Sequence, residues 1–66
     1  MKNSIKVERA RFDMTQADLA ERIGVSRQSI SAIEKGKYVP SAILALKIAR
    51  VFDLPVEAIF SLENSD

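Results

Sequence analysis

The chain has 66 residues, 47% of them hydrophobic and 29% charged, with a formal net charge of +1, a composition typical of one small globular domain. It contains no Cys and no His, which excludes a disulfide framework, a thiolate or imidazole metal site, and a Ser-His-Asp or Cys-His active site. Its apolar runs are far shorter than the ~20 residues that span a bilayer, and no signal peptide opens it, so we expect a cytoplasmic protein without metal, cofactor or membrane contact.

Two short helices are predicted in the first third of the chain. Residues 4–12 indicate the first helix, and the residues before it can be extended. Thr15 is predicted to begin the second helix, over 16–23, because its hydroxyl can accept hydrogen bonds from the free N–H groups of the first turn. Asp18 stands where a capping box needs an acceptor, and Gly24 is the expected left-handed stop.

A third helix is predicted over 27–34, with Ser26 as its N-cap and Gly36 at its end. Ile30 and Ile33 are expected to face the interior, and the polar residues around them to face outward. This helix is joined to the preceding one by a turn of only three or four residues. Two short helices joined in this way form a helix-turn-helix unit.

Two further helices are predicted in the second half of the chain. Ser41 is expected to cap a helix over 42–52 that is apolar nearly all round, and such a helix is usually buried on more than one side. In so small a protein, this excess of apolar surface suggests a subunit interface. Pro55 suits the first position of a short helix over 55–59, and the apolar–polar alternation at 59–63 predicts a short strand.

The charges are unevenly distributed along the chain. Residues 1–50 carry all ten basic groups and five acidic ones, a balance of +5, whereas residues 51–66 carry four acidic groups and no basic one. A basic body suggests a polyanion partner, although an ordinary solvated surface also gives this pattern. Arg27 and Gln28, at the start of the second helix of the unit, are long enough to reach base edges.

A series of short motifs runs through the chain: Thr15-Gln16, Leu19-Ala20, Gly24-Val25-Ser26, Gln28-Ser29-Ile30, Ile33-Glu34, Gly36-Lys37, and the segment from Pro40 through Ile48-Ala49 to Ile59-Phe60. In these residues the chain resembles the phage repressor and Cro branch of helix-turn-helix proteins, the Xre family. The resemblance implies one all-α, five-helix, lambda-repressor-like domain over 1–66, with the motif at about 15–35. It also implies that the chain ends pair as a small antiparallel sheet, and that a homodimer binds a palindromic operator in double-stranded DNA and represses transcription.

The resemblance assigns base contacts to the second helix of the motif, which lies in the major groove in this family. Arg27 suits guanine and Gln28 suits adenine, and Ser31 lies on the same face. Ala32 could meet a thymine methyl group or contact nothing, and the sequence leaves both open.

Contacts to the DNA backbone are implied for the following residues: Arg9, Thr15, Gln16, Ser26, Ser29, Lys35, Lys37 and Tyr38. Several have simpler interpretations, because Thr15 and Ser26 are caps and the lysines suit a helix C-terminus. The resemblance also implies an ion pair between Arg9 and Glu34. Glu8 departs from the family pattern, since many relatives have an apolar residue there.

The segment at about 50–63 is expected to form the dimer interface, with five contributors: Phe52, Leu54, Ile59, Phe60 and Leu62. The alternative is that these residues form only the core. A second function class is an interaction module whose apolar C-terminal surface binds another protein. An enzyme is not expected, because no plausible catalytic dyad is present, and Asp18 and Glu21 are better explained as charges near a helix start.

Overall fold

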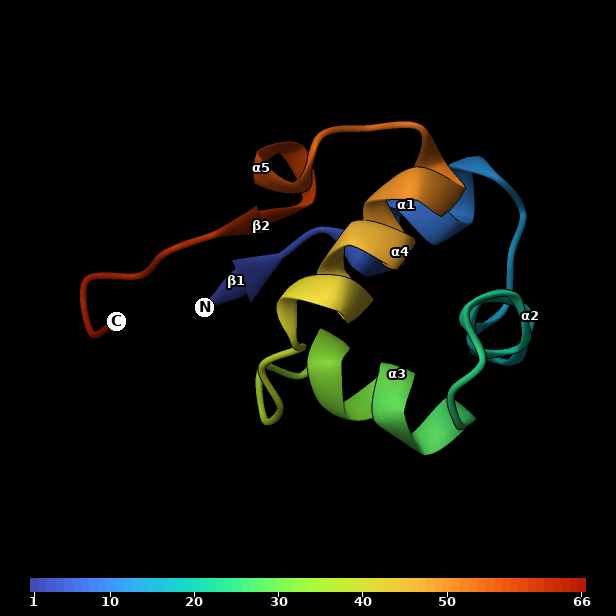
Figure 1. The fold of residues 1–66 in the computed structure, drawn as a ribbon, viewed down its shortest axis with the longest axis horizontal. Coiled ribbons are helices and arrows are strands. Elements are labelled where there is room, and N and C mark those ends of the chain that lie inside the picture. The colour runs from blue at the N-terminus through green and yellow to red at the C-terminus, as the bar shows by residue number, and fades with distance from the viewer.

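Five helices and one pair of short strands make up the protein in a computed structural model that describes all 66 residues (Figure 1). Their bounds are β1 (Lys2–Asn3), α1 (Ile5–Arg11), α2 (Gln16–Ile23), α3 (Arg27–Glu34), α4 (Ala42–Phe52), α5 (Val56–Ile59) and β2 (Phe60–Ser61). The predicted all-α, five-helix fold with a small sheet is confirmed. Pro55 is the N-cap of α5 rather than its first residue, and the second strand is shorter than the alternation at 59–63 predicted.

Local hydrogen bonds explain where α2 begins and ends. The Thr15 hydroxyl accepts from the Asp18 N–H at 3.0 Å, and the Asp18 carboxylate accepts from the Thr15 N–H at 3.0 Å. This is the predicted capping box. Gly24 ends the helix with φ 73° and ψ 36°, a left-handed conformation that residues with a Cβ rarely adopt.

The later helices begin with the same chemistry. The Ser26 hydroxyl accepts from the Ser29 N–H, and the Ser41 hydroxyl accepts from the Leu44 N–H. At the end of α3, Gly36 adopts φ 74°, and the Lys37 N–H donates to the Ala32 carbonyl at 2.9 Å. This bond fixes the start of the following loop against the last turn of α3.

The chain ends meet in a two-stranded antiparallel sheet, in which Lys2 pairs with Ser61 and Asn3 pairs with Phe60. Both termini therefore lie on one side of the molecule (Figure 1). The Asn3 side-chain Nδ2 donates to the Ile33 carbonyl at 2.9 Å. The sheet is thus tied to the C-terminal turn of α3.

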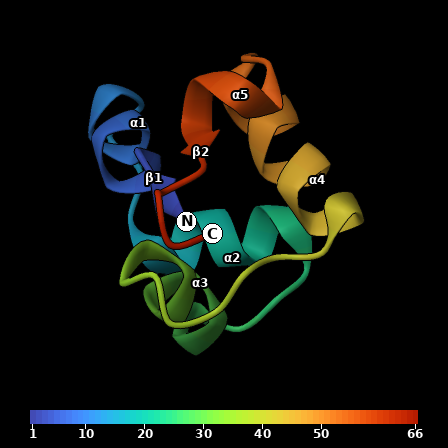
Figure 2. The ribbon, with the colours of Figure 1, turned by 90° about the vertical axis from the view of Figure 1, so that its left-hand side faces the viewer.

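One apolar core joins the elements, and Figure 2 shows α1 and α4 on opposite sides of it, with α5 above. Eleven buried residues form this core: Ile5, Leu19, Ala20, Ile23, Ile30, Ile33, Ile48, Ala49, Phe52, Ile59 and Phe60. The Phe52 ring also packs against the half-exposed Phe12 ring, with 5.7 Å between their centroids. Ala20 lets α2 and α3 approach closely, because its side chain is a single methyl group.

Most of the residues predicted for the dimer interface lie inside the single chain. Phe52 and Ile59 are 2% exposed and Phe60 is 7% exposed, so all three belong to the core of the single chain. Their apolar surface stabilises the monomer fold and offers little area to a second chain. Of the five predicted interface residues, only Leu54, which is partly buried, and Leu62, which is 79% exposed, retain accessible side chains.

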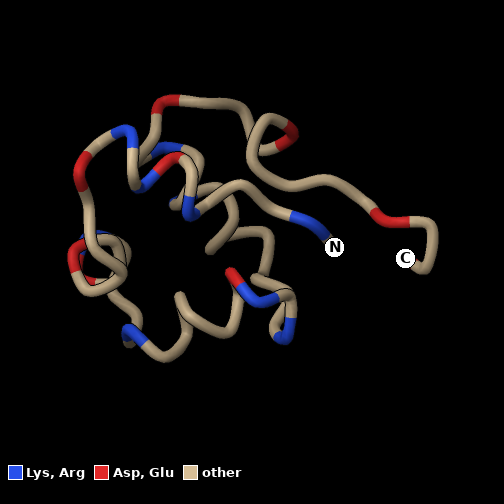
Figure 3. Tube along the Cα trace, turned by 180° about the vertical axis from the view of Figure 1, so that it is seen from behind, with Lys and Arg blue, Asp and Glu red and all other residues tan.

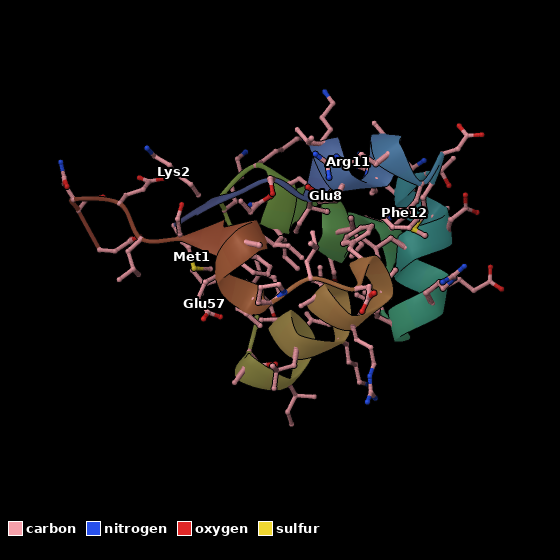
Figure 4. All side chains as sticks on the ribbon, turned by 90° about the horizontal axis from the view of Figure 1, so that it is seen from above. Met1, Lys2, Glu8, Arg11, Phe12 and Glu57 are labelled. Atoms are coloured by element: carbon pink, nitrogen blue, oxygen red, sulfur yellow. The ribbon has the colours of Figure 1, made fainter.

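Glu8 is an acidic residue on the inner side of α1, at 7% exposure. Its Oε1 has no hydrogen-bond partner and lies 3.7 Å from Nη1 of Arg11, one turn along the same helix (Figure 4). A buried carboxylate without full hydrogen bonding destabilises the fold.

Candidate nucleic-acid interface

A shallow hollow with polar walls covers the outer face of α3. Seven residues line it: Gln16, Arg27, Gln28, Ser31, Ala32, Lys35 and Lys37. They come from the start of α2, the length of α3 and the loop after α3. Figure 3 shows basic positions at both ends of α3 and in that loop. The hollow therefore combines long polar side chains with positive charge.

The helical period explains why α3 presents this face. Ile30 and Ile33 are 0% and 1% exposed and fix the inner face of α3 in the core. The positions on the opposite side of the helix then point outward, because an α-helix has 3.6 residues per turn. Arg27 and Gln28 are exposed, whereas the shorter Ser31 and Ala32 are half-buried. All four residues predicted to contact bases thus share one side of the helix.

An ion pair joins α1 to the end of α3. Arg9 Nε donates to Glu34 Oε2 at 2.6 Å and Arg9 Nη2 donates to Glu34 Oε1 at 3.0 Å, which is bidentate geometry. The two side chains are only 13% and 9% exposed. The hydrogen bond to Glu34 raises the pKa of Arg9 above its ordinary value. Arg9 Nη1 also donates to the Met14 carbonyl at 3.0 Å. Arg9, on α1, therefore holds two other segments: the loop that precedes α2, through Met14, and α3, through Glu34.

Gln16 belongs to the same network, which sequence reasoning missed. Its Nε2 donates to Glu34 Oε1 at 3.2 Å. One N–H of the amide is thereby engaged, while the second N–H and the carbonyl oxygen remain available. Glu34 therefore sets the direction of the Gln16 side chain at the edge of the hollow. No local sequence signal could reveal this contact, because the two residues lie 18 positions apart on different helices.

The other six residues predicted to contact the DNA backbone fall into two groups. Thr15 and Ser26 accept backbone N–H groups as helix caps, and the Ser29 hydroxyl lies 3.0 Å from that of Ser26. These hydroxyls have structural partners already. Lys35 and Lys37 are exposed and form no ion pair, and Tyr38 is 47% exposed beside them. The second group is free to meet an anion.

The remaining chemistry of the chain is limited. No group of three or more carboxylate, imidazole or thiol side chains is placed to hold a metal ion. No helix has both the length and the apolar character that crossing a membrane requires.

The fold of this chain and the polar outer face of α3 are those of helix-turn-helix proteins. The chain matches the Helix-turn-helix family over residues 5–59. It therefore belongs to that family, in its Xre-like branch, whose members are transcriptional regulators and not enzymes.

Relatives from bacteria and archaea align over their full or nearly full length. The chain is 52% identical over 66 residues to the uncharacterized HTH-type transcriptional regulator YgzD of Bacillus subtilis, with all of both chains covered. It is 54% identical to an uncharacterized HTH-type transcriptional regulator of Methanocaldococcus jannaschii, again over the whole of both chains. A similar regulator of Archaeoglobus fulgidus is 52% identical over all of this chain and 93% of its own length.

Proposed function

We propose that this protein is a sequence-specific regulator that binds a palindromic operator in double-stranded DNA as a homodimer and represses transcription. The observation that carries the proposal is the hollow on the outer face of α3, where Arg27 and Gln28 stand exposed beside Lys35 and Lys37. A single α-helix fits the major groove of B-DNA, and this is the groove whose edges distinguish all four base pairs. We place its action in the cytoplasm, at the nucleoid.

In this proposal the N-terminal half of α3 contacts the bases. Arg27 can donate two hydrogen bonds to O6 and N7 of guanine, and Gln28 can pair with N6 and N7 of adenine. Each good bidentate pair contributes roughly 1–3 kcal/mol of discrimination against the wrong base. Ser31 and Ala32 lie one turn further along and would meet the next base pairs.

Phosphate contacts would surround this readout face. Lys35 and Lys37 follow α3, and Gln16 stands at the N-terminus of α2, where free backbone N–H groups favour an anion. Arg9 keeps two N–H groups beyond its bonds to Glu34 and Met14, so it can also reach a phosphate. These contacts would fix the register of α3 in the groove without carrying sequence information.

The homodimer is supported by exposed apolar residues on α4. Ile43 and Leu46 are 70% and 60% exposed and line one hollow, and adjoining exposed apolar side chains are typical of an interaction surface. Leu46 lines a second hollow together with Leu54 and Val56 from the segment after α4. These residues form a continuous surface, which we call the α4 surface: Ile43, Leu46, Leu54 and Val56.

The charges around the α4 surface suit a second copy of the same chain. Lys47 and Arg50 lie on α4, and the acidic Asp53 and Glu57 follow within seven residues. An interface formed around a two-fold axis must be complementary to itself, and a border with both signs of charge meets that requirement. A dimer of this kind would present two α3 helices about 34–36 Å apart, one turn of B-DNA.

The proposal is tested by selecting binding sequences from a random duplex pool at about 150 mM salt, near physiological ionic strength. We expect a palindrome whose half-site centres lie about 10 base pairs apart. Arg22→Ala, on α2 and outside the hollow, should select the same sequence as the wild type and serves as the control. No enriched sequence would contradict base readout, and the protein-interaction function would then be favoured.

A further inference from the structure

We propose that Lys6, in the first turn of α1, binds a phosphate of the DNA backbone, so that the DNA-binding surface extends along α1 beyond Arg9. This inference rests on the proposed DNA-binding function and adds a residue to which the sequence assigned no role. The position of Lys6 relative to the end of α3 supports this assignment.

One asparagine holds the start of α1 beside the end of α3. Asn3 Nδ2 donates to the Ile33 carbonyl at 2.9 Å, and Asn3 Oδ1 accepts from the Ile5 N–H at 3.2 Å. The side chain is thus bonded to the last turn of α3 and to the first turn of α1. Figure 2 shows β1, which contains Asn3, between these two helices. The first turn of α1 therefore lies beside the end of α3, which the exposed Lys35 and Lys37 follow.

The helical period places Lys6 on the side of α1 that faces α3. Ile5 is fully buried and Glu8 is 7% exposed, so these residues mark the inner side of α1. Arg9 marks the side toward α3, because it binds Glu34. Lys6 lies one turn before Arg9, and residues three positions apart share a face of an α-helix. The exposed Lys6 side chain therefore lies along the edge that α1 shares with α3.

The positive charges at this edge have no counter-charge within the chain. Lys6, Lys35 and Lys37 form no ion pair. The Glu34 carboxylate at the end of α3 is already paired with Arg9. Free ammonium groups on neighbouring segments repel one another, and an anion that contacts them relieves this repulsion. The DNA backbone presents a row of phosphates and can meet several such groups at once.

The placement of α1 favours a phosphate over a base as the ligand of Lys6. The major groove admits a single α-helix, so an element packed beside α3 would meet the backbone at the edge of the groove. The lysine ammonium is also a point charge on a flexible stem and lacks the planar fork that reads guanine or adenine. A contact of this kind contributes to affinity and to its salt dependence, but not to sequence preference.

The test measures the affinity of the wild type and of Lys6→Ala for the selected operator between about 50 and 200 mM salt. One phosphate contact accounts for about threefold of the affinity that is lost over this range. Lys6→Ala should therefore lose about threefold less than the wild type, a salt slope smaller by about one, and should select the same sequence. Lys6→Arg keeps the charge and should keep the wild-type slope. Both variants should fold, because the position is exposed and alanine and arginine favour helices.

The contact is located with operators in which one backbone phosphate at a time is replaced by an uncharged methylphosphonate. At one position per half-site, the wild type should lose affinity and Lys6→Ala should lose nothing further. Lys37→Ala should remain sensitive at that position, because Lys37 lies on a different segment. Comparison of the four affinities removes any general effect of the substitution.

Lys2→Ala is the matched control, because Lys2 is also an exposed lysine close to the N-terminus. Lys2 lines a hollow with residues of α5 and β2, and Glu57 adds a negative charge there. Lys2→Ala should therefore keep the wild-type salt slope. An equal reduction of the slope in Lys2→Ala and Lys6→Ala would show a general effect of charge and would overturn the contact.

Two further outcomes would overturn the inference while leaving the proposed function intact. An unchanged salt slope in Lys6→Ala would show that no phosphate is bound at this position. A changed sequence preference in Lys6→Ala would show that Lys6 contacts a base instead. By contrast, a failure of the wild type to select any sequence would contradict the proposed function itself.

Discussion

At the scale of single residues, Glu34 is the side chain that connects three helices beside the candidate interface. It accepts hydrogen bonds from Arg9 on α1 and from Gln16 on α2, although it belongs to α3. The carboxylate is mostly buried and faces the positive charge of one arginine. One residue thus sets the relative positions of the two helices that are proposed to contact DNA.

Glu34→Ala should lower the free energy of unfolding by about 3 kcal/mol, because it leaves the guanidinium of Arg9 mostly buried and without its counter-charge. Urea unfolding followed by circular dichroism measures this change. Glu21→Ala, an exposed position on α2, should stay within about 0.5 kcal/mol of the wild type. If the two variants unfolded alike, the ion pair would contribute nothing to stability.

Arg27→Ala should relax base preference at one position in each half-site and weaken binding there by roughly 1–3 kcal/mol, because a bidentate contact to guanine is lost. Binding titrations against single-base variants of the operator measure this effect. Lys37→Ala is the comparison, since loss of a phosphate contact should weaken binding to all sequences and reduce the salt slope by about one. A uniform loss in Arg27→Ala would argue against base readout.

At the scale of elements, α2, α3 and α4 each begin with a side chain that accepts a free backbone N–H group, and α2 shows how this depends on ionisation. The Thr15 backbone N–H, with help from the Thr15 hydroxyl, lowers the pKa of Asp18 below its ordinary value. The charged form of Asp18 is therefore favoured in the folded state. Asp18 should stabilise the fold when it is ionised and lose this effect when it is protonated.

The expected pH dependence follows from that direction. The contribution of Asp18 should be fully present above its unfolded-state pKa of about 3.9 and should be lost as the pH falls through the lower folded-state pKa. Unfolding measured from about pH 6 down to about pH 2 should show a smaller acid destabilisation in Asp18→Asn than in the wild type. Asp13→Asn, at an exposed residue outside the capping box, should keep the wild-type dependence. An unchanged profile in Asp18→Asn would contradict the role of the capping box.

At the scale of the whole molecule, the division of apolar residues between core and surface decides how two chains can meet. Leu46→Asp on the α4 surface should yield monomers in sedimentation while the chain stays folded, because this side chain is 60% exposed. Monomers should also bind the palindrome more weakly, since the avidity of two half-sites is lost. An intact dimer in Leu46→Asp would place the interface elsewhere.

Phe60→Asp is the contrasting variant for this interface. Phe60 is 7% exposed in the core, so its loss should unfold the chain rather than separate two folded subunits. The circular dichroism of the two variants therefore distinguishes a surface residue from a core residue. A folded monomer in Phe60→Asp would show that this aromatic side chain belongs to the interface after all.

Local sequence patterns were sufficient to predict the five helices and the class of protein. Thr15, Ser26 and Ser41 mark the three longer helix starts, and Gly24 marks the turn, because each acts on backbone groups only a few residues away. The same local patterns placed Arg27 and the rest of the readout residues on one face of α3. Such features depend on residues that are close together in the sequence, and contacts between distant segments do not change them.

The packing of the helices was needed to show which apolar residues face inward at the C-terminal end and that Gln16 joins Arg9 in binding Glu34. α4 is apolar nearly all round, so its period could not show that Ile48 would be buried and Ile43 exposed. Phe52 and Phe60 were predicted for the interface, and their burial depends on how the C-terminal segment packs against the other helices. The contact between Gln16 and Glu34 likewise depends on how α2 and α3 cross. These contacts join segments that are distant in the sequence. Which side chains are buried and which pairs form is therefore decided only when the helices pack.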